Sequence, residues 1–446
     1  MKRFTHGGVH PPENKLTQGV GVSVMELPTK VVIPLVQHIG APAKCLVKKG
    51  DMVVVGQLIG EATGFVSANI HASIAGKVTS VEAVKNGQGV AIPSVTIVRG
   101  AEDEDVWSEE IIRDTTLIES CELEPKEIFE RIKMAGIVGM GGAQFPTHVK
   151  LSIPDGKSAD TLVVNGAECE PYLTSDHQSM LSRGEELLTG VKILMRLLGV
   201  KKARIGVENN KRNAIKSLRK LNDKRTGIKV ESLKVMYPQG GEKQLIEAVT
   251  GRQVPPPPAL PIDVGVVVVN VATVLAIYDA VQRRKPLFER VVTVSGKSVA
   301  EGRNLLARMG TSTEEMIAAV GGLPEDTGKV IGGGPMMGRV IVNLDAPITK
   351  GTSGITIISE EESLRPAEYP CFKCGKCVEA CPMALEPYLL KKLGERRLLD
   401  QLEQNHIVDC IECGCCQFTC PAKVPLLDHV RLAKQRTMAM IRSRKS

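Results

Sequence analysis

The sequence predicts a multidomain protein of mixed α/β and β structure, with four units in succession. Three observations support this fold class. The chain is 446 residues long, which is too long for a single hydrophobic core. Residues 125–285 alternate between strand-like and helix-like stretches, which is typical of an α/β domain with a largely parallel sheet. Residues 366–446 hold two similar runs of cysteines in a region that is otherwise helical.

The composition is that of an ordinary globular protein, with 43% hydrophobic and 24% charged residues. No stretch approaches the roughly 18 uncharged apolar residues of a membrane-spanning helix, and the N-terminus lacks the apolar segment of a signal peptide. We therefore expect an intracellular protein, whose twelve cysteines are metal-ligating thiolates or free thiols rather than disulfides. Nucleic acid is not expected as a partner, because aromatic residues make up only 3% of the chain.

The N-terminal unit, residues 1–110, is rich in Val, Ile and Gly, a composition that predicts short strands joined by glycine turns. Its stretches "VKKGD", "VGQLIG" and "ASIAGKV" resemble the barrel-sandwich hybrid of biotinyl and lipoyl carrier domains. Those domains present a lysine for modification on a hairpin between their two halves. The corresponding stretch here, "GFVSANI", has no lysine, so we predict a structural or partner-docking module.

In residues 125–285, a first helix is predicted over "EPKEIFERIKMAG", with Pro125 in its first turn and Gly136 as its stop. The expected strands are "TLVVNGA", "ARIGVE", "IKVESLKV" and "VGVVVVN", and the helices between them are "EELLTGVKILMRLLG", "NAIKSLRKL" and "EKQLIEAV". Residues 286–350 are predicted to form a smaller β-grasp unit of the SLBB type. In it, "RVVTVSG" is a strand, residues 304–322 are mainly helical, and "GKVIGGGPMMGRVI" returns as a strand and tight turn.

The two cysteine runs are the most specific signal in the chain. They are Cys371-x2-Cys374-x2-Cys377-x3-Cys381-Pro and Cys410-x2-Cys413-x2-Cys416-x3-Cys420-Pro, the spacing of bacterial ferredoxins with two [4Fe–4S] clusters. Structural zinc fits less well, because zinc sites usually use separated pairs of cysteines. The signal therefore predicts a ferredoxin-like helical domain over residues 366–446.

Three thiolates two residues apart fit one tight loop, whereas the fourth is carried away as the chain turns helical. We therefore expect the two runs to exchange their fourth ligands. One cluster is assigned to Cys371, Cys374, Cys377 and Cys420, and the other to Cys410, Cys413, Cys416 and Cys381. Cys415 breaks the two-residue spacing and is interpreted as the surplus cysteine.

The segments around the second cysteine run also carry predictions. Leucines at near-helical spacing predict two amphipathic helices that shield the clusters: Leu389, Leu390, Leu393, Leu398, Leu399 and Leu402. After the second run, basic residues outnumber the single acid, Asp428: Lys423, Arg431, Lys434, Arg436, Arg442, Arg444 and Lys445. This basic tail is either a solubilising end or a docking element for an anionic membrane surface or an acidic partner.

A glycine-rich loop, "GIVGMGGAQFPTHVKL" over residues 136–151, opens the α/β unit. Its glycines are suited to close approach by a phosphate or a flat ring, or to a plain turn. Polar residues follow two of the predicted strands: "NGAECEPYL" follows the first, and Asn270 and Thr273 follow the last. An open α/β sheet binds its ligand at the carboxyl ends of its strands, so these groups are expected at one site.

Together, these features resemble the flavin-bearing, NADH-oxidising subunit of respiratory complex I over residues 130–285. The whole chain resembles the C subunits of Rnf complexes, the ion-translocating ferredoxin:NAD+ oxidoreductases. The stretches that support this wider resemblance are "GGVHPPENK", "QHIGAP", "FPTHVKL", "NGAECEPYLT" and "GGEKQLI".

The resemblance implies roles for individual residues. Glu168 and Glu170 are implied beside the flavin and the bound nicotinamide, at the catalytic position. The implied cofactor-binding positions, for the FMN ring, its phosphate and the dinucleotide, are Gly139, Gly141, Gly142, Phe145, Lys150, Asn165, Gly241, Glu242, Asn270 and Thr273. The chain departs from the complex I pattern where Met140 replaces an arginine, Ala167 an acid and Val269 an asparagine.

The implied function is that of a peripheral electron-transfer subunit at the cytoplasmic face of the cell membrane. FMN exchanges a hydride with NAD(H), electrons pass through two [4Fe–4S] clusters, and the partners are the other members of the complex and, indirectly, ferredoxin. One alternative is a cobalamin reductase with the same flavin and cluster modules. Another is a cluster-carrying adaptor without flavin, an alternative motivated by Met140, Ala167 and Val269. Cys45, Cys121 and Cys169 are interpreted as idle or buried thiols.

Overall fold

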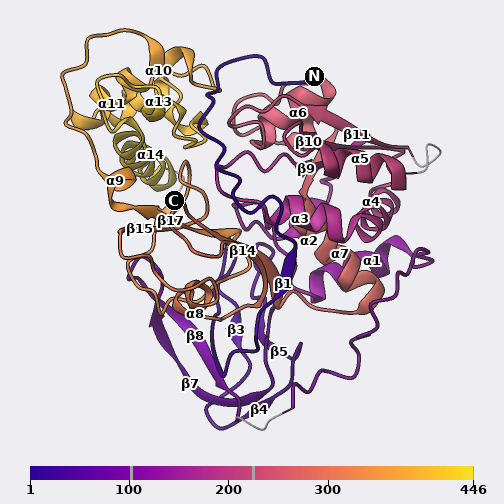
Figure 1. The fold of residues 1–446 in the computed structure, drawn as a ribbon. Helices are drawn as coiled ribbons and strands as arrows, with labels where there is room; N and C mark the ends of the chain where they lie inside the picture. Colours follow the sequence, from indigo (N-terminus) through magenta and orange to yellow (C-terminus); the bar gives the residue numbers. More distant parts are fainter. Residues whose placement is uncertain (101–103, 223–226, 445–446) are drawn as a thin grey trace.

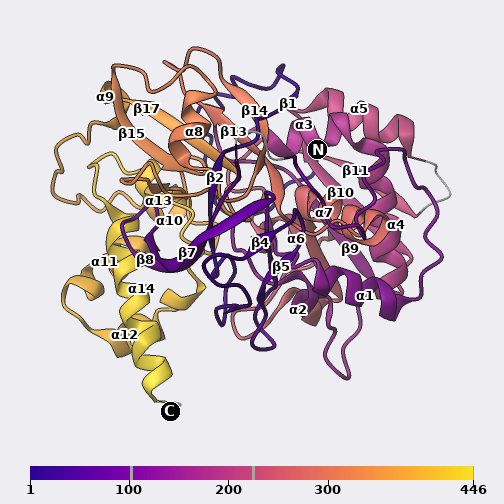
Figure 2. The same cartoon turned by 90° about the horizontal axis from the view of Figure 1, so that it is seen from below.

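The computed structural model describes residues 1–100, 104–222 and 227–444. In Figure 1 the α/β unit lies at the upper right, the C-terminal helices at the upper left and the N-terminal strands at the bottom, with a second β-rich unit between them. The view from below in Figure 2 shows the same separation, with the N-terminal strands between the C-terminal helices and the α/β unit. The relative positions of functional residues therefore depend on contacts between the units as well as on contacts within each unit.

The N-terminal unit consists of two small antiparallel sheets, as its glycine-punctuated strands predicted. One has the order β2-β8-β7-β4 and the other β3-β5-β6. The strand bounds are β2 (Lys30–Pro34), β3 (Lys44–Cys45), β4 (Met52–Val53), β5 (Leu58–Glu61), β6 (Ile70–His71), β7 (Gly76–Lys85) and β8 (Ala91–Val98). Alternate residues such as Val31, Ile33 and Ile97 point into a shared core between the sheets.

The α/β unit has a four-stranded sheet of order β11-β10-β9-β12, in which all strands are parallel, so the predicted parallel sheet is confirmed. Its strands are β9 (Thr161–Gly166), β10 (Lys202–Glu208), β11 (Ile228–Leu233) and β12 (Val266–Asn270). Its helices are α1 (Pro125–Met134), α2 (Thr147–Leu151), α3 (Ser175–Ser182), α4 (Gly184–Leu198), α5 (Arg212–Leu221), α6 (Glu242–Thr250) and α7 (Val271–Arg283), with a 3-10 turn at Pro261–Val264. The short helices α2 and α3 were not predicted.

The third unit is a six-stranded mixed sheet of order β1-β14-β13-β17-β15-β16. Its elements are β1 (Val22–Val24), β13 (Glu289–Ser295), β14 (Arg303–Arg308), α8 (Thr313–Ala318), β15 (Thr327–Gly332), β16 (Arg339–Val340), β17 (Gly354–Ser359) and α9 (Glu360–Ser363). The sheet takes in β1 and β17, which lie outside the predicted range 286–350.

The prediction that residues 304–322 are mainly helical was wrong. The first part of this stretch is β14, which pairs antiparallel with β13, and helix α8 begins only after the capping box of Ser312 and Glu315. Leu, Ala, Arg and Met favour helices in isolation, but pairing with β13 buries Leu305 and Ala307 in the sheet core. Tertiary contacts here override the local propensity.

The C-terminal unit is helical, and its two cysteine loops have the same backbone shape. Its elements are α10 (Lys376–Glu379), α11 (Pro387–Glu395), α12 (Leu399–Gln404), a 3-10 turn (Ile407–Asp409), α13 (Cys415–Phe418) and α14 (Leu426–Ser443). α10 and α13 each follow a glycine in the left-handed region, Gly375 (φ 78°) and Gly414 (φ 80°). The predicted amphipathic helices are α11 and α12, whose Leu390, Leu393 and Leu402 are buried. Leu398, predicted to belong to this core, is 37% exposed because it precedes α12 at a bend.

The basic tail is mostly the long helix α14 rather than a free extension. One face of α14, with Leu427, Val430 and Ala433, is buried against the rest of the C-terminal unit. Several of its basic side chains are paired: Arg431 and Lys434 with Glu412, and Arg444 with Asp400 and Glu403. Lys445 lies outside the described residues. Among the described residues, no helix is long and apolar enough to cross a membrane.

The first residues of the chain join the units to one another. Val9 pairs with Tyr237 of the α/β unit, and the Gly8 N–H donates to the carbonyl oxygen of Ala380 in the C-terminal unit. Gly7 lies so close to the first cysteine run that a Cβ atom there would be 2.6 Å from the backbone of Cys381. The stretch "GGVHPPENK" is therefore a strap between the α/β and C-terminal units, and its glycine permits the close approach.

A buried lysine joins three of the units. Lys350 is 1% exposed, and its ammonium donates to the carbonyl oxygens of Asn69 (2.6 Å) and Gly136 (2.7 Å). Its backbone N–H donates to the side chain of Gln37. Because the ammonium is buried without a carboxylate partner, the pKa of Lys350 is lowered to about 7. Gly136 is the first residue of the glycine-rich loop, so this contact fixes where that loop begins.

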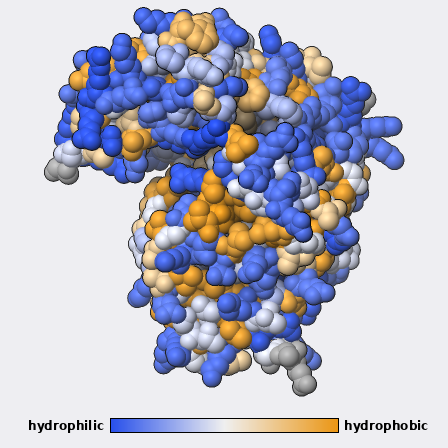
Figure 3. All heavy atoms as spheres, turned by 60° about the vertical axis from the view of Figure 1, so that its left-hand side comes forward, coloured by the Kyte–Doolittle hydropathy of each residue, from blue (hydrophilic) through white to orange (hydrophobic). Residues whose placement is uncertain are grey.

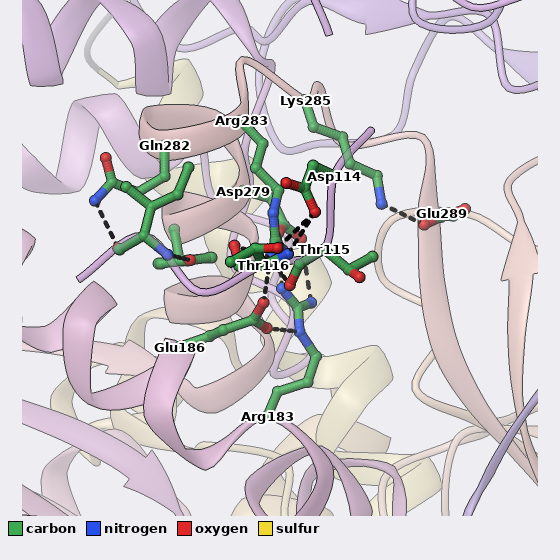
Figure 4. A network of polar contacts seen from close by, with 12 residues as sticks. Asp114, Thr115, Thr116, Arg183, Glu186, Asp279, Gln282, Arg283, Lys285 and Glu289 are labelled. Carbon is green, nitrogen blue, oxygen red and sulfur yellow. Dashed lines mark hydrogen bonds and ion pairs between the residues drawn. The ribbon is translucent and has the colours of Figure 1, made fainter. Parts of the chain in front are cut away.

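Figure 4 shows a network of charged side chains that holds the linker before α1 against α7. Asp279 on α7 accepts two hydrogen bonds from Arg183, at 2.7 and 3.1 Å, and one from Arg283 at 3.0 Å. Arg283 also pairs with Glu186 and donates to the carbonyl oxygen of Thr115 in the linker. Asp279 is 8% exposed, so each buried charge here depends on its partners.

We expect Asp279→Ala to lower the free energy of unfolding by about 3–5 kcal/mol, because it leaves two arginines without their shared carboxylate. Urea unfolding followed by the fluorescence of Trp107, the single tryptophan, measures this loss. Trp107 packs edge-on against Phe288 beside the same linker, with ring centroids 5.3 Å apart. Asp428→Ala, which removes the exposed ion pair with Arg365, serves as the control and should leave the Trp107 transition in place. Equal shifts in both variants would contradict the network's role.

Candidate functional site

A cavity of about 1680 Å³ lies at the carboxyl ends of β9 and β12. Its walls come from the α/β unit, the six-stranded sheet, the N-terminal sheets and, at Ile411, the C-terminal unit. Figure 3 shows one face of the molecule hollowed below an overhang, with hydrophobic residues gathered there. The predicted catalytic and cofactor-binding residues all line this one cavity: Gly139, Gly141, Gly142, Phe145, Lys150, Asn165, Glu168, Glu170, Gly241, Glu242, Asn270 and Thr273.

The glycine-rich loop lies flat across the start of α7. The Met140 N–H donates to the hydroxyl of Thr273 at 2.9 Å, and the Gly139 N–H donates to the carbonyl oxygen of Phe145 at 2.8 Å. A Cβ atom on Gly141 would lie 3.2 Å from the Cβ of Asn270, and Gly142 (φ 131°) has open space beside it. Thr273 is 1% exposed and therefore anchors the loop from below.

Two asparagines hold the strand ends in place. The Asn165 side chain donates to the carbonyl oxygen of Gly240 and accepts from the Ala167 N–H. The Asn270 oxygen caps α7 by accepting from Ala272 and Thr273, and its Nδ2 donates to Asp176 Oδ2 at 2.6 Å. Both amides therefore fix backbone around the cavity as well as lining it.

The two predicted catalytic glutamates have their carboxylates engaged by backbone N–H groups. Glu168 accepts from the N–H of Asp176 (2.8 Å) and of His177 (3.2 Å) at the start of α3. Glu170 accepts from the N–H groups of Met336 (3.0 Å) and Met337 (2.8 Å) in the turn between β15 and β16. Burial raises the pKa of Glu170 to about 7, against the opposing effect of these donors. Glu170 thus joins the α/β unit to the six-stranded sheet.

Two lysines hold the loop that carries both glutamates. Lys15 Nζ donates to the carbonyl oxygens of Glu168, Glu170 and Leu173 at 2.7–2.8 Å. Lys211, which is 2% exposed, donates to the carbonyl oxygen of Ala167 at 2.7 Å. Burial, followed by the charge of Lys211, lowers the pKa of Lys15 to about 8. The residue pair is thus a structural support for the loop.

An ion pair crosses one end of the cavity. Lys150 Nζ lies 2.7 Å from Glu242 Oε1 and 3.1 Å from the carbonyl oxygen of Val268. Both side chains of the pair are partly exposed, at 34% and 41%. Glu242 is the first residue of α6, and Gly241 is its N-cap. The cavity therefore has a positive side chain and a helix N-terminus at the same end, an arrangement that favours a phosphate.

The cysteines of the two runs meet across the internal repeat. A small apolar pocket is lined by Cys381 of the first run and by Cys410, Cys413, Cys415 and Cys416 of the second. Cys377 of the first run and Cys416 and Cys420 of the second pack against a neighbouring apolar cluster of Ala422, Val424 and Leu426. Burial, followed by the charges of Cys420 and Cys371, raises the pKa of Cys377. Among the described residues, no group of three or more His, Cys, Asp or Glu side chains is already arranged to hold a metal ion.

Tyr237 joins the cavity to the second cysteine loop. Its ring lines the cavity, and its hydroxyl donates to the carbonyl oxygen of Cys413 at 2.8 Å. The thiol of Cys415 donates to the carbonyl oxygen of Tyr237 at 3.8 Å, and Cys415 is fully buried. The cavity and the cysteine loop therefore share one wall.

Comparison with known proteins is consistent with this arrangement. The family model described as the Nuo51 FMN-binding domain matches residues 132–279, and the RnfC barrel sandwich hybrid domain matches residues 3–102. The C subunit of the proton-translocating ferredoxin:NAD(+) oxidoreductase complex of Clostridium ljungdahlii is 44% identical, over 98% of this chain and 95% of its own length. The chain belongs to the RnfC family.

Two further comparisons agree with this membership. The C subunit of the Na(+)-translocating ferredoxin:NAD(+) oxidoreductase complex of Acetobacterium woodii is 43% identical, over 98% of this chain and 97% of its own length. A chain of an NAD+-reducing [NiFe]-hydrogenase in the H2-reduced state has the same fold, with TM-score 0.50 and 18% identity, over 70% of this chain and 63% of that chain. The resemblance to the RnfC family is confirmed, together with its barrel-sandwich and complex I-like flavin domains.

Sequence reasoning missed several residues of the site. Lys15, Lys211, Tyr237 and Asp176 contact its central loops or line its wall. Lys15 stood in "GGVHPPENK", and Asp176 and Tyr237 stood in "GAECEPYLTSD" and "YPQGGEKQLI", stretches beside predicted strands, but no role was predicted for any of the three. The signal for Asp176 was "TSD" ahead of a helix, a typical helix start, since Asp176 lies in the first turn of α3.

Proposed function

We propose that this chain is the NADH-linked electron-transfer subunit of an ion-translocating ferredoxin:NAD+ oxidoreductase complex. FMN, held in the cavity, exchanges a hydride with NAD(H), and two [4Fe–4S] clusters carry the electrons onward one at a time. The observation that supports this most strongly is the shared wall between the cavity and the second cysteine loop. Membership of the RnfC family supports the same assignment.

The residues present fit an FMN. Gly142 has open space beside it, so a flat ring can approach the loop backbone there, and Gly141 allows the loop to pack closely against Asn270. Lys150 would hold the FMN phosphate, once its ammonium is shared between that phosphate and Glu242. The departures at Met140, Ala167 and Val269 leave this cradle intact, because Met140 and Ala167 contribute backbone atoms to it.

The cavity has room for a second ligand beside the flavin. Its volume exceeds the roughly 300–1,000 Å³ of typical small-molecule sites. Phe145 and Gly241, which the resemblance implies on the dinucleotide side, line the same space. In this arrangement, Glu168 and Glu170 contribute to the reaction mainly by fixing the backbone around the cavity, because their carboxylates already accept hydrogen bonds from backbone N–H groups.

The cysteines support the exchange of fourth ligands between the runs. Cys381 lies in one pocket with Cys410, Cys413 and Cys416, and Cys420 is near enough to Cys377 for its charge to act on that thiol. The cluster on Cys410, Cys413, Cys416 and Cys381 would stand next to the cavity. The cluster on Cys371, Cys374, Cys377 and Cys420 would stand farther out, because Cys371 and Cys374 are exposed.

The wider assignments belong to the same proposal. The six-stranded unit with α8 is an SLBB-type β-grasp, and the C-terminal unit is ferredoxin-like. The chain is a peripheral protein at the cytoplasmic face of the membrane, where the other members of the complex connect it to ferredoxin. Ion pairs on α14 favour packing within the chain over membrane docking for much of the basic tail.

Two alternatives make different predictions. A cobalamin reductase of the same architecture would reduce cob(III)alamin as fast as ferricyanide with NADH as donor. A flavin-free adaptor would fail to take up FMN. The N-terminal sandwich, which precedes the flavin domain, favours the ferredoxin:NAD+ oxidoreductase assignment over the first alternative.

The decisive experiment is anaerobic purification of the full chain, followed by flavin extraction, iron and sulfide counts, and assay of NADH:ferricyanide reduction. We expect bound FMN, iron for two four-iron clusters and NADH oxidation. A folded protein with full iron content but neither FMN affinity nor NADH oxidation would contradict the proposal.

Lys150→Met should weaken FMN binding about ten- to a hundred-fold, because it removes a charge-assisted hydrogen bond to the phosphate of about 1.5–3 kcal/mol. Titration of the flavin by fluorescence quenching measures the change. Riboflavin, which lacks the phosphate, should bind wild type and variant alike. The control is Lys157→Met, which removes an ion pair with Asp263 outside the cavity. A variant that loses FMN and riboflavin affinity equally would show a merely structural role for Lys150.

Cys415→Ser should leave the iron content of the chain unchanged, whereas Cys420→Ser should lose the cluster of the first run. Iron and sulfide analysis with electron paramagnetic resonance of the reduced protein distinguishes the two clusters. The physical reason is that Cys415 contacts Tyr237, while Cys420 lies with Cys377 across the repeat. Loss of the second-run cluster in Cys420→Ser would show that the runs keep their own fourth ligands.

A further inference from the structure

We propose that Asp176 holds the proton that the flavin site needs when it accepts a hydride, and that Glu168 and Asn270 keep Asp176 in place for this role. This proposal rests on the proposed function, because it concerns the cavity assigned to FMN. Asp176 lies in the first turn of α3, lines the cavity and is half-buried. It is the carboxyl group next to Asn270 and hence next to the glycine-rich loop.

Asp176 and Glu168 form a carboxyl pair with unequal surroundings. Glu168 accepts hydrogen bonds from three donors, the N–H groups of Asp176 and His177 and the hydroxyl of Ser175. The side chain of Asp176 has one donor, Asn270 Nδ2, on Oδ2. Two neighbouring carboxyl groups do not both ionise easily, so the one that accepts fewer hydrogen bonds keeps its proton. Of this pair, Asp176 accepts fewer hydrogen bonds.

The charges around Asp176 come from several elements. Glu168 lies in the loop after β9, Arg290 on β13 and Lys211 just before α5. Burial and then the charge of Glu168 raise the pKa of Asp176 to about 7, against Asn270, Arg290 and Lys211, which act to lower it. His177, on α3 itself, contacts Asn213, and burial lowers its pKa, so it adds no charge here at neutral pH. The proton on Asp176 is therefore present below about pH 7 and lost above it.

The proton balance follows from the chemistry of the cofactors. NADH gives up a hydride, which brings two electrons and one proton, and full reduction of a flavin takes one further proton. Asp176 supplies that proton from its O–H group and becomes a carboxylate next to Asn270. When the two electrons leave through the clusters, two protons leave the site: one returns to Asp176 and one goes to solvent. Per NADH, the chain thus releases two electrons and one proton.

Asp176→Asn isolates the proton from the geometry. The asparagine keeps an oxygen that accepts from Asn270 Nδ2, but it has no acidic proton. The first measurement needs no flavin: infrared spectra of the full chain, in mildly acidic and mildly alkaline buffer, for the protonated-carboxyl C=O band. We expect a wild-type band that weakens as the pH rises through about 7 and a smaller band in Asp176→Asn, where Glu170 and Glu208, whose pKa values burial also raises, account for what remains. Asp160→Asn, an exposed aspartate outside the cavity, is the control and should keep the whole band.

The second measurement is the midpoint potential of the bound FMN against pH, by spectroelectrochemistry of the full chain. Near neutral pH, the wild type takes one proton fewer from solvent, so the slope in Asp176→Asn should be steeper by about 30 mV per tenfold change in proton activity. A merely structural role would shift the potential without changing its slope. Equal slopes, or an infrared band that Asp176→Asn leaves unchanged, would overturn the proposal. If Asp176→Asn weakens the protonated-carboxyl band but the wild-type chain binds no FMN, the proposed function is overturned instead.

Discussion

The ammonium group of Lys15 supports the loop on which the cavity and its contacts with the other units depend. It donates to three carbonyl oxygens of residues 168–173, which are about 150 residues away along the chain. That loop carries Glu168, which caps α3, and Glu170, which binds the turn between β15 and β16. The strap that bears Lys15 also contacts the first cysteine run through Gly7 and Gly8. One short segment therefore sets the positions of the flavin cradle, the six-stranded sheet and the cysteine loops together.

This arrangement gives a physical reason for the contacts between the units. The cavity needs walls from several units, because an isolated α/β sheet offers only a shallow crevice at its strand ends. Lys350 hydrogen-bonds to the start of the glycine-rich loop, and Tyr237 hydrogen-bonds to Cys413 in the C-terminal unit. Polar groups buried between units are costly unless they are paired, so each of these contacts favours one geometry. The distance from cavity to cysteine loop is thereby fixed by hydrogen bonds rather than by packing alone.

The sequence predicted the elements whose signals are local. Four consecutive valines before Asn270 predict a strand buried on both faces, and the repeated cysteine spacing predicts a repeated loop, which Gly375 and Gly414 confirm in shape. It failed for residues 304–322, where helix-forming residues pair with β13 instead. It also gave no role to Lys15 or Asp176, because a local pattern does not tell which distant loop a side chain reaches. The loop glycines and the polar residues after the first and last strands were singled out by their place in the α/β pattern, whereas their individual roles, and Phe145, Lys150, Gly241 and Glu242, came from the family resemblance.

The positions of the carboxyl groups show which of them have structural roles and which one is available to carry a proton. Glu168 and Glu170, the two glutamates singled out by sequence, accept hydrogen bonds from backbone N–H groups. Their carboxylates therefore hold α3 and the turn after β15 in place. A change of charge on either carboxylate would weaken contacts that hold the fold. Asp176 has no such duty beyond one amide, and it faces the cavity. Structural and proton-carrying roles are thus separated onto neighbouring carboxyl groups, so the proton can move without loosening the loop that Lys15 supports.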